Sequence, residues 1–85
     1  MASPKRAFES VIRSQGTVAF RDLERLLIKL GFRLARTAGS HHIYVYVHPR
    51  VGRPVNIQAA GKDAKPYQVR QIRDIIEEFK LTLDD

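Results

Sequence analysis

The apolar residues in the second quarter of the chain recur with the period of an α-helix. The apolar face of the segment FRDLERLLIKLG consists of Phe20, Leu23, Leu26, Leu27 and Leu30. Gly31 follows the last apolar position, where a left-handed cap favours glycine, and Asp22 lies in the first turn, where the helix dipole favours a negative charge. The pattern therefore predicts an amphipathic helix that begins at Phe20 and ends before Gly31.

Two further segments have the same period. The first covers residues of about 5–15, where Phe8, Val11 and Ile12 share one face and Gly16 marks the end. The second, PYQVRQIRDIIEEFKL, begins at Pro66, a favoured first helical residue. Its apolar positions are Val69, Ile72, Ile76 and Phe79. We expect Leu26, Leu27, Ile72 and Ile76 to belong to the core.

Three strand-like runs, FRLART, HIYVYVHP and PVNIQ, lie between the second and third helices. The turn RVGR joins the last two runs into a predicted hairpin. Alternation predicts that one face of this hairpin packs on the helices and carries Ile43, Val45, Val47, Val55 and Ile57. The other, open face is expected to carry Tyr44, Tyr46, Asn56 and Gln58. The segment AAGKDAK that follows is predicted to be a polar loop.

The order of these elements predicts an α+β fold. Its core is α-β-β-β-α with an extra N-terminal helix, and the helices lie on one face of a three-stranded antiparallel sheet. Double-stranded-RNA-binding domains have this layout. We expect one domain over residues 1–85, made of a helical extension (1–16), a core (17–80) and a tail (81–85).

The charge of the chain points to a polyanionic partner. Fifteen Lys and Arg against nine Asp and Glu give a formal net charge of +6 on 85 residues. The sequence contains no Cys, which excludes disulfides and thiolate zinc sites, and we expect no metal and no cofactor. No apolar run approaches the ~20 residues that span a bilayer, and the first residues lack the apolar core of a signal peptide. We therefore expect a cytoplasmic protein without a membrane partner.

The candidate chemistry centres on the stretch GSHHIY. Histidine is the side chain that exchanges protons near neutral pH, so His41 and His42 are candidate general acid–base groups. Residue type alone also allows a structural role for both. The candidate RNA-binding residues are Arg36, Ser40, Tyr44, Arg53, Lys62 and Lys65. Ser40 suits turn formation as well, and Tyr44 suits either base stacking or cross-strand packing.

Several pieces of sequence occur together in a recognisable order. They are the helix end LLIKLGF, a basic strand, GSHHIY, His48-Pro49, a hairpin, Gly61-Lys62, and Lys65-Pro66 at the start of the last helix. In this order and spacing, residues of about 20–80 resemble the HicA family of toxin–antitoxin ribonuclease toxins. The resemblance implies a double-stranded-RNA-binding-like fold, metal-independent cleavage of mRNA, and a HicB-type antitoxin that covers the active site.

The resemblance also implies that the catalytic histidine is His41, because the family's histidine follows a Gly-Ser or Gly-Gly pair. Alternation points the other way, since a regular strand places His41 on the packed face with Ile43 and His42 on the open face with Tyr44. We follow the motif and keep His42 as the second candidate. The expected function is an endoribonuclease toxin of a type II toxin–antitoxin system. The alternatives are a non-catalytic RNA-binding module of the same fold and an interaction protein with an acidic protein partner.

Overall fold

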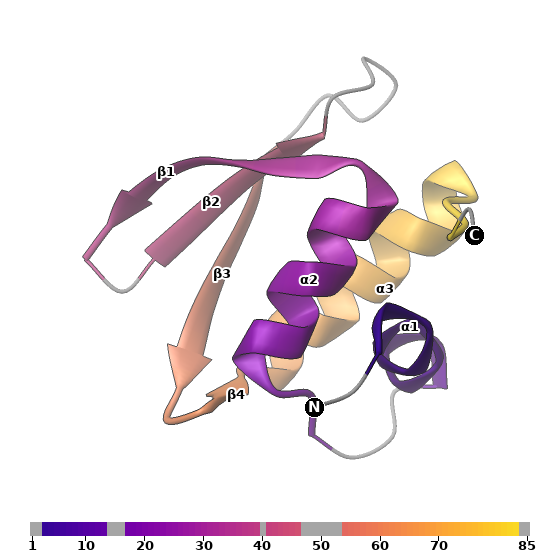
Figure 1. Cartoon of the computed structure of the whole chain (residues 1–85), viewed down its shortest axis with the longest axis horizontal. Coiled ribbons are helices and arrows are strands. Elements are labelled where there is room, and N and C mark those ends of the chain that lie inside the picture. The colour runs from indigo at the N-terminus through magenta and orange to yellow at the C-terminus, as the bar shows by residue number, and fades with distance from the viewer. Residues whose placement is uncertain (1–2, 14–16, 40, 47–53, 84–85) are drawn as a thin grey trace.

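A computed structural model describes residues 3–13, 17–39, 41–46 and 54–83 of the chain. Its elements are α1 (Pro4–Arg13), α2 (Phe20–Leu30), β1 (Phe32–Ala38), β2 (His41–Tyr46), β3 (Val55–Ala60), β4 (Asp63–Ala64) and α3 (Pro66–Phe79). The strands gather on one side of the molecule and the helices on the other, with α2 between the sheet and α1 (Figure 1). The predicted α+β class is confirmed.

Helix α2 begins and ends where its apolar period predicts. Gly31 adopts the left-handed conformation, with φ of 111°, and its N–H donates to the carbonyl of Ile28 at 3.1 Å. Glycine reaches this conformation without the strain that a Cβ would add. Leu23, Leu26 and Leu27 are fully buried, so the apolar face of the helix is the face that packs.

The other two helices also match the pattern, with small differences at their ends. Helix α1 covers Pro4–Arg13, and the last predicted residues lie outside the described part. Helix α3 begins at Pro66 as predicted but ends at Phe79. Lys80 then turns left-handed, with φ of 52°, and the N–H of Leu81 donates to the carbonyl of Ile76 at 3.0 Å. The helix therefore ends two residues before the predicted end, and Leu81 itself is buried.

The sheet of the described residues has four antiparallel strands in the order β1-β2-β3-β4, which corrects the prediction of three. The fourth strand lies in AAGKDAK, which was expected to be a loop. Gly61, with φ of 68°, makes a tight turn that returns Ala64 to a position opposite Ala59. Two residues are too few to show alternation, so the composition of this segment predicted a loop.

The register between β2 and β3 also differs from the prediction. His42 pairs with Ile57 and Tyr44 pairs with Val55, while Ile43 pairs with Asn56. Directly paired residues share a face, and Val55 and Ile57 are buried against the helices whereas Asn56 is exposed. His42 therefore lies on the helix-facing side of β2, where regular alternation had placed it on the open face. Alternation groups the residues of one strand correctly, but the choice of inward group depends on the turn and on contacts made elsewhere in the chain. Val47 lies outside the described residues.

One hydrophobic core joins all the helices to the sheet. Its largest fully buried side chains are Leu23, Leu26, Leu27, Ile57, Ile72, Ile75, Val11 and Val55. Leu26, Leu27, Ile72 and Ile76, the four residues expected in the core, are all buried. Ala7 and Val11 of α1 belong to the same core cluster as α2, α3 and β3. The boundaries of the extension, core and tail remain a prediction. None of the described helices is long and apolar enough to cross a membrane.

Candidate functional site

His42 is held on the helix-facing side of β2. Its Nδ1 lies 2.8 Å from Oε2 of Glu24 on α2, and its ring meets the ring of Phe20 edge-on, with centroids 5.0 Å apart and planes at 89°. Both side chains of this contact are only partly exposed, His42 by 29% and Glu24 by 22%. When Nδ1 carries a proton and donates it to the carboxylate, the ring is fixed in one tautomer and Nε2 can accept a proton.

His41 has different pairing partners from His42 in the sheet. His41 pairs with Ala38 of β1 and with Gln58 of β3, one step out of phase with His42. Gln58 is held from two directions. Its backbone N–H donates to Oε1 of Gln68 at 2.6 Å, and its own Oε1 accepts from Nζ of Lys65 at 3.0 Å. The structure therefore brings Lys65, a predicted phosphate-binding residue, to the residue that pairs with His41.

Two other predicted cations border the same end of the sheet. Arg36 is exposed on β1 and pairs with Ile43, two positions from His41, just after an irregularity between Leu34 and Arg36. Lys62 is exposed in the turn between β3 and β4, and its carbonyl accepts from the N–H of Phe20 at 2.9 Å. Both side chains are therefore available to a negatively charged ligand.

The remaining predicted site residues are not brought into this group. Ser40 and Arg53 lie outside the described residues. Tyr44 pairs with Val55 of β3, and the structure describes only its backbone, so its predicted place on the open face remains a prediction. Among the described residues, no three or more Asp, Glu or His side chains gather where they could hold a metal ion.

Sequence reasoning missed the residues that orient this region. Glu24 and Phe20 approach His42 across 18 or more residues of chain, and a polar helix position carries no signal for such a contact. Gln68 is 3% exposed on α3, where a helical pattern marks it only as a polar residue beside Val69. Its role is to accept the N–H of Gln58, a donor that β4 does not reach.

The comparison with protein families assigns the chain to a class of proteins. Residues 20–81 match the model of a family described as the HicA toxin of bacterial toxin–antitoxin. No individual curated protein and no solved structure shows significant similarity to the chain. The match identifies a toxin of a toxin–antitoxin pair, and it includes both histidines, Lys62 and Lys65.

The match spans most of the 85 residues, from the first residue of α2 to Leu81. The chain belongs to the HicA toxin family. This confirms the resemblance drawn from the sequence pieces. It also implies an antitoxin as the partner of the chain.

Proposed function

We propose that this chain is a metal-independent endoribonuclease that cleaves mRNA, and that a HicB-type antitoxin of a type II system inhibits it. The observation that carries the proposal is the family match over residues 20–81, which includes the GSHHIY stretch. The approach of Lys65 to the residue paired with His41 supports it, because cleavage of RNA needs a proton-transfer group beside a cation. The core is expected to be double-stranded-RNA-binding-like.

The proposed reaction uses the RNA's own 2′-hydroxyl. The 2′-oxygen attacks the adjacent phosphorus while the bond from phosphorus to the 5′-oxygen breaks. One proton leaves the 2′-hydroxyl and one joins the departing oxygen. His41 transfers one of these protons, and the candidates for the other are His42, Tyr44 and a lysine. The substrate is RNA because DNA lacks the nucleophile.

The cations of the site stabilise the charge that develops on the phosphate. Lys65 is oriented by Gln58, and Lys62 and Arg36 are exposed on neighbouring elements. A phosphate in the transition state carries more negative charge on its outer oxygens, so fixed positive groups lower the barrier. Ser40, Tyr44 and Arg53 complete the proposed RNA-binding set.

The proposal includes a mode of inhibition by the antitoxin. The expected inhibitor presents acidic or polar side chains to the cations around GSHHIY and competes with RNA for one surface. Complementary charges of this kind speed association and make it sensitive to salt.

The test is incubation of the purified protein with mRNA in excess chelator. We expect cleaved products that carry 2′,3′-cyclic phosphate ends, as the 2′-hydroxyl mechanism requires. A stable RNA complex without products would favour the non-catalytic RNA-binding module. Absence of both binding and cleavage at low salt would favour an acidic protein as the ligand of the basic surface.

A further inference from the structure

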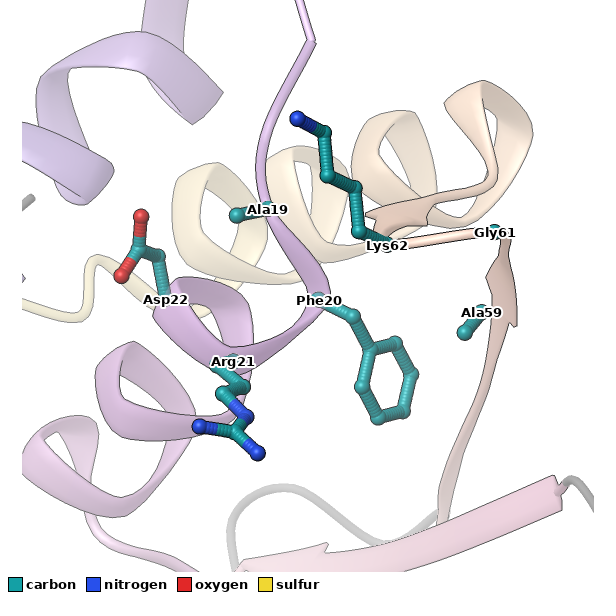
Figure 2. Close-up of a pocket in the computed structure, with 7 residues that line it drawn as sticks. All are labelled: Ala19, Phe20, Arg21, Asp22, Ala59, Gly61 and Lys62. Atoms are coloured by element: carbon teal, nitrogen blue, oxygen red, sulfur yellow. The ribbon is translucent and has the colours of Figure 1, made fainter. Parts of the chain in front are cut away.

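A cavity of about 480 Å³ lies between the first turn of α2 and the end of β3 (Figure 2). It is lined by Ala19, Phe20, Arg21, Asp22, Ala59, Gly61 and Lys62. Its volume lies within the range of small-molecule sites in proteins, about 300–1,000 Å³. The cavity is therefore large enough to hold one nucleotide unit.

The lining combines an apolar wall with cations. Phe20 on α2 and Ala59 on β3 point toward one another in Figure 2, whereas Arg21 and Lys62 extend in opposite directions. Arg21 and Lys62 are both exposed, and together they outweigh the single carboxylate of Asp22. An apolar wall suits the flat face of a base, and a cation on either side suits a phosphate chain that continues in both directions.

The walls of the cavity are held in place by the backbone. The N–H of Phe20 donates to the carbonyl of Lys62 at 2.9 Å, and Ala19 forms a bridge with Asp63. The N–H of Ala64 donates to the carbonyl of Val18 at 2.8 Å. These bonds fix the start of α2 against the turn between β3 and β4. A preformed site loses less entropy when a ligand binds.

The cavity adjoins the proposed cleavage site. The Phe20 ring that lines it also contacts the ring of His42, a candidate for the second proton transfer. Ala59 lies one position from Gln58, the pairing partner of His41, and so belongs to the opposite face of β3 at the same end of the sheet. A nucleotide in the cavity would therefore be a close neighbour of the phosphate that the proposed mechanism cleaves. Contacts with its base would favour some cleavage positions over others.

We propose that this cavity binds the base of an RNA nucleotide next to the cleaved bond, and that it sets the sequence preference of cleavage. The inference rests on the proposed ribonuclease function and adds a site of base recognition to it. Ala19, Phe20 and Ala59 contact the base, and Arg21 and Lys62 contact the flanking sugar–phosphate backbone.

The test is an NMR titration of the full-length protein with each of the four nucleoside 5′-monophosphates. At least one of them is expected to shift the backbone amides of Ala19, Ala59, Gly61 and Lys62 with saturation. Ala59→Leu fills the cavity and is expected to weaken that binding about tenfold, the effect of losing one stacked base. Ala60→Leu is the matched control, because Ala60 is an exposed neighbour on β3 that does not line the cavity.

Cleavage of an mRNA of mixed sequence gives a second measurement. Ala59→Leu is expected to change the base frequencies beside the cut, and Ala60→Leu is expected to leave them as in the parent. If Ala59→Leu does not fold, Arg21→Ala and the exposed control Arg70→Ala decide in the same titration. Weaker binding confined to Arg21→Ala supports the inference, and equal binding overturns it.

The outcomes separate this inference from the proposed function. Cleavage by the parent, with nucleotide binding and base preference unchanged in Ala59→Leu, would overturn the cavity and leave the ribonuclease in place. Nucleotide binding that Ala59→Leu weakens, in a protein that cleaves no RNA, would retain the cavity and reject the ribonuclease. Loss of antitoxin binding in Ala59→Leu, with nucleotide binding intact, would assign the cavity to the protein interface and overturn the inference.

Discussion

His41 and His42 are neighbours in β2, yet they register with different parts of the molecule. His42 pairs with the buried Ile57 and is held by Glu24 and Phe20 of α2. His41 pairs with Gln58, which Lys65 contacts. Two histidines at adjacent positions of one strand therefore pair with different residues of β3. We infer that the main role of His42 is to attach the strand to the helix layer and that His41 performs one of the two proton transfers.

The largest effect is expected for His41→Ala in the cleavage assay. Loss of a general acid–base group lowers rates by roughly 10²–10⁴-fold, and we expect a loss in this range with no change in thermal stability. The measurement is the initial rate of RNA cleavage together with a thermal unfolding curve. Parent activity in His41→Ala and none in a folded His42→Ala would reverse the roles of the two histidines.

His42→Ala is expected to act mainly on stability. It removes a partly buried bond to Glu24 and the edge contact with Phe20, which together contribute about 1–2 kcal/mol. Denaturant unfolding measures this, with His41→Ala as the matched histidine control. Glu24→Gln is expected to lie between the parent and His42→Ala, because an amide still accepts a hydrogen bond. If all three variants unfold with the same free energy as the parent, the contact between His42 and Glu24 does not stabilise the fold.

Lys65→Ala is expected to reduce cleavage about fivefold, an effect of roughly 1 kcal/mol for one charged group beside the reacting phosphate. Lys65 donates to the side chain of Gln58, the residue that pairs with His41. The exposed Lys29 near the end of α2 offers a control of equal charge. Equal rates for Lys65→Ala and Lys29→Ala would remove Lys65 from the site.

A smaller effect is expected in the salt dependence of RNA binding. Each phosphate neutralised on a single strand adds about 0.7 to the slope of log affinity against log salt. Lys62→Glu is expected to lower the slope by about this amount, whereas Arg13→Glu at the end of α1 should leave it nearly unchanged. Binding by both variants is measured in an inactive His41→Ala background. A flat titration for the parent would contradict an RNA interface dominated by phosphate contacts.

The smallest effect is expected for antitoxin binding. A rim of cations dominates such an encounter, so His41→Ala should retain the affinity of the parent for the HicB-type antitoxin. Calorimetric titration, with and without excess RNA, measures it. Simultaneous binding of antitoxin and RNA, with full affinity for both, would contradict competition for one surface.

The sequence predicts most where local signals agree. Helix α2 is specified by its apolar period and by Gly31, and both are visible within twelve residues of chain. The faces of β2 are not specified in this way. They depend on pairing with β3 and on a carboxylate 18 residues away that allows the polar His42 to face the helices.

The candidate site also has a part that the sequence predicts and a part that it does not. The histidines and lysines could be chosen as candidates from their residue types and their order, since the chemistry of a side chain is visible in the sequence. The cavity beside Phe20 and the link from Gln68 through Gln58 to Lys65 arise from tertiary packing alone. Phe20 was predicted only as a core residue, and its contact with His42 has no counterpart in the sequence.

The edges of the sheet have a consequence for solubility. The backbone around β4 is occupied by Val18 and Ala19, and Gln68 accepts the N–H of Gln58 on β3. Among the described strands, this leaves β1 as the long edge without a neighbour on its outer side. Such edges recruit strands from other molecules, and charged side chains oppose that addition. Arg33 and Arg36, both exposed on β1, repel a second copy of the same edge, and this protection against aggregation weakens as salt screens the two charges.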